Sequence, residues 1–435
     1  MSFPRYPTYK KSKSGWMFDV PGHWELLPCR GFVEERTEKN ADASCQSYLS
    51  LMANVGVIPY EEKGDIGNKR PDDLSKCKVV HKGDFVINSM NYGIGSYGVS
   101  SYEGVCSPVY IILRPKSEVI EPSFAFRVFE DKSFQAYAQS FGNGILAHRC
   151  SIGWDDLKGI AVGIPPAEEQ KSIINFLDNE TAKIDSLISK QEQLIELLQE
   201  KRQAVISHAV TKGLNPNAPM KVSGVEWLGE VPEHWEEARV KQFFRPKKDQ
   251  GHPDLEVLSV YRDHGVVPKN SRNDNFNKTP EDLSKYQLVE IDDLVINKMK
   301  CWQGSLGISQ LRGITSPDYI VLSSRHSQNS KFLHWLLRSK TYSSTYRAIS
   351  NGIRPSQWRV ESERFLCLPV FVPPLEEQSS ISEYISVRNE NFNNLTELAE
   401  TQISLLRERR SALISAAVTG QIDVRDLGSG QEVAT

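Results

Sequence analysis

The 435-residue chain has no apolar run that approaches the roughly 20 residues needed to span a bilayer. Its N-terminus, MSFPRYPTYKKSKSG, carries cations but no apolar segment of the kind a signal peptide needs. The seven cysteines include no Cys-x-x-Cys pair, which argues against both a disulfide framework and a zinc site. These absences predict a cytoplasmic protein with reduced thiols, no metal and no contact with a membrane.

Signatures of catalysis are absent as well. The sequence has no Asn-Pro-Pro-aromatic sequence of adenine methylation, no Gly-x-x-x-x-Gly-Lys-Ser/Thr loop and no His-Glu-x-x-His. Acidic clusters at 71–73 and 280–282 precede Leu-Ser-Lys, and we interpret them as helix starts rather than nuclease sites. The chain is therefore predicted to be no enzyme. A nuclease or methyltransferase with a divergent site is the alternative.

The charge balance gives only a weak signal. The formal net charge is −3, which is unusual for a protein that binds nucleic acid. Acidic residues outnumber basic ones in the segments that we assign below to long helices. Only an uneven surface distribution of the remaining charge could produce a face that binds phosphates.

The sequence contains an internal duplication. Residues 71–90 and 280–299 match at 11 of 20 positions at an offset of 209, and 95–113 matches 304–322 at the same offset. A period of this length is too long for a solenoid and predicts two copies of a whole domain related by a pseudo-twofold axis. Such a molecule suits a partner with approximate twofold symmetry, of which duplex DNA is the leading example.

Each copy begins with a globular part of mixed α and β character. Helix-like spacing of apolar residues predicts helices over 123–140 and 331–350. Short β-branched runs bounded by Gly, Asp or Pro predict strands at 84–88, 109–113, 293–297 and 319–322. The expected fold class is α+β, with two duplicated mixed α/β domains.

A long helix follows each globular part. The sequence Pro-Pro-x-Glu-Glu-Gln at 165–170 and 373–378 is a helix start, and Gly213 and Gly420 supply the stops. About 40 residues make a rod of roughly 60 Å. Apolar residues recur by sevens at Leu177, Ile184, Leu198 and Val205, with Leu187 and Leu194 beside them, and at Ile385, Phe392, Ala399, Leu406 and Leu413.

We expect the two rods to pack on each other as an antiparallel coiled coil that holds the globular parts apart. Packing of each rod on its own domain alone is the alternative.

Comparison of the two copies separates a shared frame from two variable segments. Residues 91–94 (Asn-Tyr-Gly-Ile) correspond to 300–303 (Lys-Cys-Trp-Gln) between matching flanks, and the residues after Asn-Gly-Ile at 143–145 and 351–353 also differ. The variable residues are of the types that read bases and phosphates, although drifting surface loops are the alternative. The candidate DNA contacts are Asn91, Tyr92, His148 and Arg149 in the first copy and Lys298, Lys300, Trp302, Gln303, Arg354, Ser356, Gln357 and Arg359 in the second.

Residues that match between the copies have other predicted roles. His23, Trp24, His234 and Trp235 belong to the shared frame and are interpreted as structural. The ends of the long helices also match, as two identical partner subunits would require. The candidate partner-binding residues are Arg202, Ile206, Val210, Arg410, Ile414 and Val418.

These features together resemble the DNA specificity subunit of type I restriction-modification systems. The resemblance rests on 6–11 (Tyr-Pro-Thr-Tyr-Lys-Lys), 229–235 (Gly-Glu-Val-Pro-Glu-His-Trp), both Pro-Pro-x-Glu-Glu-Gln sequences and the matching helix ends. It covers nearly the entire chain. The first copy departs from it at 16–20, where Trp-Met-Phe-Asp-Val replaces the Glu-Trp-Leu-Gly-Glu-Val of 226–231.

The resemblance implies two target-recognition domains that read the halves of a bipartite site in double-stranded DNA, with the antiparallel helices as a spacer. The first such domain is expected at 1–166 and the central spacer helix at 167–213. The second domain with its entry linker is expected at 214–372, the distal spacer helix at 373–420 and a tail at 421–435.

The resemblance also implies partners. These are two modification (methyltransferase) subunits that use S-adenosylmethionine and restriction (motor-nuclease) subunits that use ATP and Mg. The chain itself would be a non-catalytic subunit without a cofactor. A coiled-coil scaffold without sequence readout is a further alternative.

Overall fold

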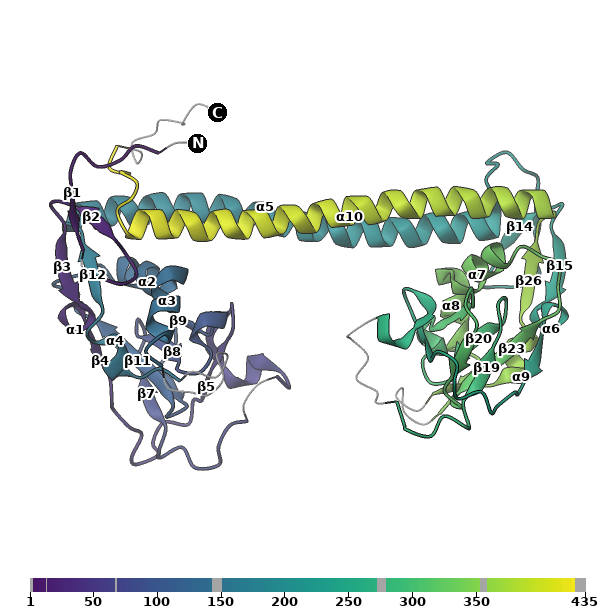
Figure 1. Cartoon of the computed structure of the whole chain (residues 1–435), viewed down its shortest axis with the longest axis horizontal. Coiled ribbons are helices and arrows are strands. Elements are labelled where there is room, and N and C mark those ends of the chain that lie inside the picture. Colours follow the sequence, from purple (N-terminus) through teal and green to yellow (C-terminus); the bar gives the residue numbers. More distant parts are fainter. Residues whose placement is uncertain are drawn as a thin grey trace. The chain divides into compact units, whose positions relative to one another are not determined.

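The computed structural model describes residues 3–12, 14–66, 69–142, 151–271, 279–352 and 358–426. The chain divides into two compact units, Met1–Gln191 with Thr401–Thr435 and Glu192–Glu400. Each unit contains one globular part and a stretch of both long helices, α5 (Ala167–Lys212) and α10 (Leu375–Val418) (Figure 1). No helix in the described ranges is long and apolar enough to cross a membrane.

The first unit is built on a four-stranded antiparallel sheet. Its strands, in spatial order, are β4 (Val33–Glu35), β11 (Tyr110–Pro115), β8 (Phe85–Asn88) and β9 (Tyr97–Val99). Antiparallel pairs accompany it: β1 (Tyr9–Lys11) with β2 (Asp19–Pro21), β3 (Glu25–Pro28) with β12 (Ala161–Ile164), β5 (Leu49–Met52) with β6 (Gly56–Pro59), and β7 (Lys78–Val80) with β10 (Gly104–Cys106). Its shorter helices are α1 (Cys29–Phe32), α2 (Pro122–Glu130), α3 (Lys132–Gln139) and α4 (Trp154–Leu157).

The second unit repeats these elements in the same order. Its sheet consists of β16 (Phe244–Lys247), β23 (Tyr319–Ser324), β20 (Leu294–Asn297) and β21 (Leu306–Ile308). Its antiparallel pairs are β13 (Met220–Val222) with β14 (Glu230–Pro232), β15 (Glu236–Arg239) with β26 (Pro369–Val372), β17 (Leu258–Tyr261) with β18 (Gly265–Pro268), β19 (Gln287–Val289) with β22 (Gly313–Thr315), and β24 (Ser350–Asn351) with β25 (Arg359–Val360). Its shorter helices are α6 (Val240–Phe243), α7 (Ser330–Arg338), α8 (Lys340–Tyr346) and α9 (Ser362–Leu366).

The central strands of both sheets are buried on both faces, which explains their continuous apolar sequence. On one face of β8, Phe85 packs in the core that contains α2 and α3, and on the other Val86 packs against the β5–β6 hairpin. Alternation of side chains along a strand produces this division. In the second unit Leu294 and Val295 divide in the same way. The strands predicted at 84–88, 109–113, 293–297 and 319–322 are thus confirmed as β8, β11, β20 and β23.

The expected helix starts at 71–73 and 280–282 are wrong. Both segments are turns that precede β7 and β19. The carboxylates of Asp73 and Asp282 accept hydrogen bonds from the backbone amides of Ser75 and Ser284, at 2.8 and 2.9 Å. An aspartate that binds the amide two residues ahead stabilises a turn without any helix.

The helices expected over 123–140 and 331–350 are each interrupted once. Asp131 and Ser339 have extended ψ angles of 127° and 152°, and each ends one helix and begins the next. Their side chains accept hydrogen bonds from the amides of Phe134 and Tyr342 and so cap α3 and α8. A polar side chain that caps a new helix competes with continuation of the old one.

The two long helices run antiparallel within each unit. In the first unit Arg410 Nε donates to Asp185 Oδ1 at 3.0 Å, and in the second Arg202 Nη1 donates to Asn393 Oδ1 at 3.1 Å. Leu177, Ile184, Ile385, Ala399 and Leu413 of the expected seam are buried, whereas Leu187 and Leu194 are exposed. Segments of both helices share a core with each globular part, so the packing is not restricted to one helix per domain.

The shared Val-Pro-x-His-Trp sequence binds the first turn of a long helix in both units. Glu169 at the start of α5 accepts hydrogen bonds from Trp24 Nε1 and contacts His23 Nε2, both at 2.7 Å. Glu377 at the start of α10 contacts His234 Nε2 at 2.7 Å and accepts from Trp235 Nε1 at 3.3 Å. The structural role predicted for these histidines and tryptophans agrees with these contacts.

The same tryptophans also contact the ends of the long helices. Gly213 ends α5 with φ of +77°, and a Cβ there would lie 3.6 Å from the Trp235 ring. Gly420 follows α10 with φ of +70°, and a Cβ there would lie 3.1 Å from the Trp24 ring. Glycine suits both the left-handed backbone and the close approach. Each His-Trp pair therefore holds the start of one long helix beside the end of the other.

The glutamine of each helix start joins the helix to the globular part. Gln170 Nε2 donates to the Pro165 carbonyl at 2.9 Å, and its Oε1 accepts from the Glu121 amide, which precedes α2, at 2.7 Å. Gln378 makes the matching bonds with Pro373 and with Asn329, which precedes α7. The Pro-Pro-x-Glu-Glu-Gln sequence therefore starts the long helix and also attaches it to the globular part.

We expect Glu169→Ala to lower the free energy of unfolding by about 2 to 3 kcal/mol, because it leaves buried donors without their charged acceptor. Urea unfolding of the full chain followed by tryptophan fluorescence measures this. Glu377→Ala should cost less, since the Glu377 side chain is 28% exposed against 6% for Glu169. Glu168→Ala on the same helical turn is the control, and an equal loss in that variant would contradict the assignment.

Candidate nucleic-acid interface

In each copy, the residue after the second variable segment is bonded at the end of the central strand, next to the first variable segment. In the first unit the Ile152 amide, just after the second segment, donates to the Ser89 carbonyl at 3.1 Å. In the second unit the Val360 amide makes the matching bond with the Lys298 carbonyl, also at 3.1 Å. Residues that are about 60 positions apart in sequence are therefore bonded to each other in each unit.

The first variable segment is a short 3-10 turn on the same backbone frame in both copies. The turns are η2 (Tyr92–Ile94) and η5 (Cys301–Gln303). Gly95 and Gly304 follow them with φ of +92° and +88°. A left-handed residue is needed there to return the chain to the next strand, and glycine adopts that conformation without a steric cost. The frame thus fixes the turn while leaving its exposed side chains free to differ.

The second unit presents an aromatic and basic cluster at this surface. The Trp302 and Trp358 rings lie edge to face with centroids 5.3 Å apart, and the Arg347 guanidinium lies 4.9 Å from the Trp358 ring centroid. Trp302 Nε1 donates to the Met299 carbonyl at 3.1 Å, which fixes the ring. Lys300, Gln303 and Arg359 are exposed beside these elements, and Lys298 is partly buried. Such side chains suit contact with bases and phosphates.

Arg347 and Trp358 were not among the candidate residues. Arg347 follows α8 and is brought to the surface turn only by the tertiary fold. Trp358 lies in the variable segment, so the difference between the copies was the signal that could have identified it. No periodicity or motif marks Arg347.

In the first unit the prediction for Tyr92 needs correction. Its side chain is fully buried, and its hydroxyl donates to the Phe129 carbonyl at 2.6 Å. Burial raises the pKa of Tyr92 well above its ordinary value, so the hydroxyl stays protonated. Its counterpart Cys301 is buried too, which makes this position part of the core in both copies. Asn91 is exposed at the start of the turn.

The remaining candidates have no structural account. His148, Arg149, Arg354, Ser356 and Gln357 lie outside the described residues.

The helix ends predicted to bind a partner face inward. Ile206 and Val210 are buried in the core of the second unit, and Ile414 and Val418 in the core of the first. Arg202 and Arg410 form the interhelical hydrogen bonds described above. Matching of these residues between the copies is accounted for by packing within each unit.

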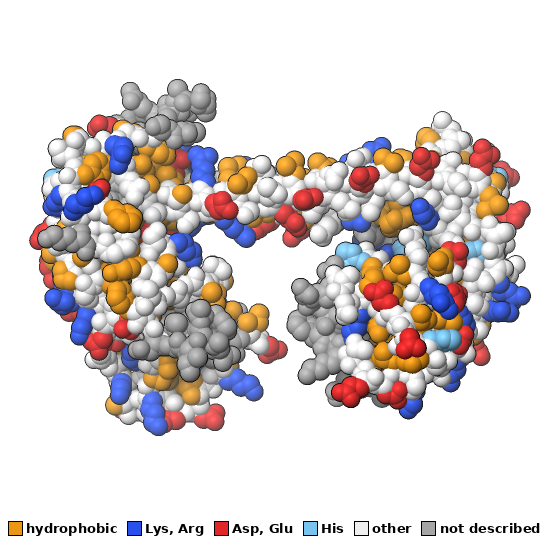
Figure 2. Space-filling model, in the orientation of Figure 1, with side chains coloured by type: hydrophobic (Ala, Val, Ile, Leu, Met, Phe, Trp, Pro, Cys, Tyr) orange, Lys and Arg blue, Asp and Glu red, His pale blue; other side chains and the backbone are white. Residues whose placement is uncertain are grey.

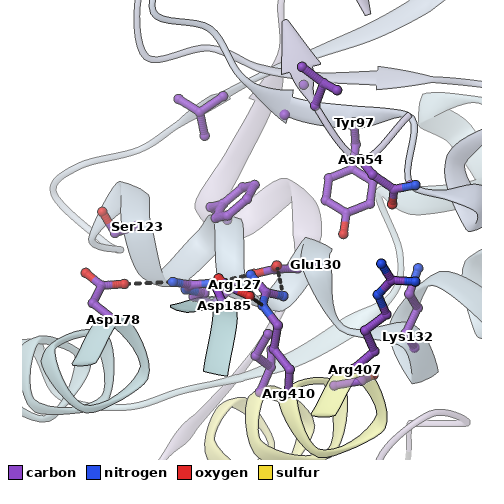
Figure 3. A pocket seen from close by; sticks show the side chains of 18 of the residues that line it. Asn54, Tyr97, Ser123, Arg127, Glu130, Lys132, Asp178, Asp185, Arg407 and Arg410 are labelled. Atoms are coloured by element: carbon purple, nitrogen blue, oxygen red, sulfur yellow. Dashed lines mark hydrogen bonds and ion pairs between the residues drawn. The ribbon is translucent and has the colours of Figure 1, made fainter. Parts of the chain in front are cut away.

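A second polar feature lies in the first unit, where a groove of about 1140 Å³ separates the globular part from the long helices (Figure 3). Glu130 bridges two arginines across it, accepting from Arg127 Nη1 at 2.6 Å and from Arg410 Nη1 at 2.8 Å. Arg127 also donates to Asp178 Oδ1 at 2.7 Å, and Arg410 to Asp185 Oδ1 at 3.0 Å. This network joins α2 to both long helices.

The described side chains at these turns are of types that bind ligands. No group of three or more His, Cys, Asp or Glu side chains in the described ranges could hold a metal ion. The candidate residues of the surface turns are amides, cations and aromatic rings, which bind but do not form a nucleophile with a base. The exposed cations and aromatic rings around η5 in the second unit suit a protein of the nucleic-acid-binding class.

Comparison with known proteins agrees with this class. Residues 41–197 match the type I restriction modification DNA specificity domain. The chain is 23% identical over 430 residues to the type I restriction enzyme MjaVIII specificity subunit of Methanocaldococcus jannaschii, covering 94% of this chain and 95% of that one. It is 21% identical to the EcoKI specificity subunit of Escherichia coli, covering 74% and 71%.

The fold has a solved counterpart. A chain from a structural study of complex assembly and conformational transition in the type I R-M system superimposes with a TM-score of 0.65 at 14% identity, covering 93% of this chain and 99% of that one. These matches support the resemblance of the chain to type I restriction-modification DNA specificity subunits, and the solved structure shows a shared fold.

We expect Glu130→Ala to destabilise the first unit by about 3 to 5 kcal/mol, because it leaves two partly buried arginines without their shared carboxylate. The side chains of Glu130, Arg127 and Arg410 are 9%, 11% and 28% exposed. Thermal and urea unfolding of the full chain measure the loss. Asp155→Ala removes an ion pair whose carboxylate is 86% exposed and serves as the control, with an expected loss of at most about 1 kcal/mol. Equal losses would show that the network adds no stability.

Proposed function

We propose that the chain reads a bipartite target in double-stranded DNA, one half with each globular part. The observation that carries this proposal is the surface at the end of each central strand. There the shared frame presents side chains that differ between the copies, and the residue that follows the second variable segment is hydrogen-bonded beside the first. A frame with exchangeable contact residues suits two similar domains that recognise different sequences.

The long helices fit the role of a spacer between the two half-sites. α5 is continuous over 46 residues and connects the first globular part to the second. A continuous helix has a fixed rise per residue of about 1.5 Å, so it can set a constant separation along DNA.

Catalysis in this proposal belongs to other subunits. Modification subunits would supply methyl transfer with S-adenosylmethionine, and restriction subunits would supply ATP- and Mg-dependent motor and nuclease activity. The chain is non-catalytic and holds none of these cofactors. The cation- and amide-rich surface turns support binding rather than chemistry.

Exposed leucines on the long helices offer a surface for a modification subunit. Figure 2 shows hydrophobic side chains at the surface of these helices. In the second unit Leu197 and Leu398 are 61% and 58% exposed, and Leu194 and Leu395 are 42% and 49% exposed. Burial of a leucine against a partner contributes about 1.5 to 3 kcal/mol. Two modification subunits per chain would match the duplication of the helices.

The reading surface is tested by the triple variant Lys300→Ala, Gln303→Ala and Arg347→Ala. These positions are exposed, whereas an exchange of the whole turn would also alter the buried Cys301. A lost base contact should cost about 1 to 3 kcal/mol of binding free energy and weaken the base preference at one position of the target. A lost phosphate contact should lower the slope of log affinity against log salt concentration by about one. Methylation mapping in cells that co-express the modification partner should show a change in one half-site only.

Lys241→Ala, an exposed lysine in α6, is the matched control and should leave the motif intact. An unaltered methylation motif in the triple variant would overturn the assignment of the reading surface. Methylation or cleavage of DNA by the purified chain alone would instead favour an enzyme with a divergent site.

The docking surface is tested by the double variant Leu197→Asp and Leu398→Asp. Because both side chains are exposed, its stability should remain within about 0.5 kcal/mol of the natural chain, while co-purification of the modification subunit should fall. Ile206→Asp is the contrast: its side chain is 6% exposed, so the charge should cost several kcal/mol of unfolding free energy. A stable double variant that retains two partners per chain would exclude this surface.

A further inference from the structure

The internal duplication places different chemistry at one matched junction. In the first unit Glu130 of α2 accepts a hydrogen bond from Arg410 near the end of α10. The residues 208 positions away are Arg338 of α7 and Arg202 near the end of α5, which belong to the second unit. The first unit therefore pairs a carboxylate with an arginine at this junction. At the matching positions the second unit has two arginines.

The rest of the charged network is also missing from the second unit. Asn393 replaces Asp185 as the acceptor for the helix arginine, and its oxygen is 3.1 Å from Arg202 Nη1. Trp335 and Ser386 stand at the positions of Arg127 and Asp178. The junction of the second unit thus lacks the carboxylates of the first, keeps the helix arginine as Arg202, and has Arg338 in place of Glu130.

The N–H groups of Arg338 outnumber the hydrogen-bond acceptors that surround its side chain. Its Nη1 lies 2.7 Å from His334 Nε2, and its Nη2 donates to the Arg262 carbonyl. Its Nε is shielded from solvent, and no acceptor lies within hydrogen-bond distance in the described part of the chain. A guanidinium that is largely buried with an unpaired donor is costly unless something else supplies the acceptor.

His334 adds a second unpaired donor. The Ile308 amide donates to its Nδ1 at 3.2 Å, while Arg338 points a donor at its Nε2. Burial, followed by the charge of Arg338, lowers the pKa of His334 to about 3, so the ring is neutral at pH 7. A neutral imidazole has one acceptor nitrogen and one N–H. Both nitrogens face donors, so one donor in this cluster has no acceptor.

The carboxylate of Asp263 lies nearby but does not pair with the surplus N–H donors. Asp263 acts on both Arg202 and Arg338 through its charge. Its side chain is 68% exposed, however, and its Oδ1 pairs with Arg262 Nε at 3.3 Å. Solvent screens an exposed carboxylate, which makes it a weak partner for buried donors.

A groove reaches His334 of this cluster. Its volume is about 620 Å³, and His334 and Trp335 form part of its wall. Its polar lining includes Gln310, Asn329, Ser330 and Lys331, with Asp292 as the acidic side chain. Apart from Asp292, the polar side chains that line the groove are two amides, two hydroxyls, the imidazole of His334 and the cation Lys331.

We propose that Arg202, His334 and Arg338 form a binding site for a phosphate-class oxyanion in the second unit. The anion supplies the acceptor that Glu130 supplies in the first unit. When Arg338 turns its guanidinium edge toward the anion, Nε gains an acceptor and His334 Nε2 is released to carry its own proton. Planar guanidinium groups suit such anions because two N–H groups can bind two oxygens. Free inorganic phosphate and a DNA backbone phosphate share this chemistry.

Thermal unfolding of the full chain in inorganic phosphate tests the site, with chloride at equal ionic strength as the reference. At a phosphate concentration ten times its Kd, the folding equilibrium constant should rise about elevenfold. Arg338→Gln should abolish this rise. Arg338→Glu should also abolish it while staying folded, because it restores the carboxylate of the first unit opposite Arg202. Lys241→Ala, which removes an exposed cation of α6, is the control and should respond to phosphate as the natural chain does.

Two results would overturn the site. One is a natural chain that gains nothing from phosphate beyond chloride, which would leave water as the acceptor. The other is an equal gain in Arg338→Gln, which would show an adventitious ion only.

DNA binding at matched ionic strength separates the two sources of the anion. If inorganic phosphate weakens DNA binding by the natural chain but not by Arg338→Glu, a DNA phosphate occupies the site. If phosphate stabilises the chain and DNA binding is unaltered, the site holds a free anion. The thermal measurement requires no DNA, so its failure is distinguishable from a failure of the proposed reading function.

Discussion

The fold of each unit depends on a carboxylate in the first turn of a long helix. Glu169 and Glu377 each bind a tryptophan and a histidine of the globular part, and the same tryptophan ring contacts the glycine that ends the other helix. A charged acceptor with two donors is strong only where water is excluded, and the buried indoles exclude it. Loss of this contact would weaken the attachment of both helices to the globular part.

This contact fixes the backbone frame that both copies share. The side chains of the surface turns can therefore differ between the copies without altering the frame. Gly95 and Gly304 hold η2 and η5 in the same backbone conformation, while the exposed side chains around them differ. The core takes one residue from each turn, Tyr92 or Cys301. The exposed turn residues are released from packing, so they can differ between the copies without a cost to the core.

The junction between the globular part and the long helices carries different charged side chains in the two units. The first is closed by the Glu130 network, and the second by Arg202 and Arg338 without a buried carboxylate. Similar backbones therefore carry different arrangements of charge. In the first junction the charged groups are paired with one another. In the second, N–H donors remain unpaired and can bind an anion from the solvent.

The sequence by itself determined the duplication, the long helices with their start and stop residues, the central strands and the α+β class, because repetition and hydrophobic periodicity are local properties of the chain. It also separated the shared frame from the variable turns. Only the tertiary structure decided that Tyr92 is buried, that Arg347 joins Trp358, and that Ile206 and Ile414 face inward. Burial and pairing depend on residues distant in sequence, so an exposed base reader and a buried tyrosine look alike until the chain is folded.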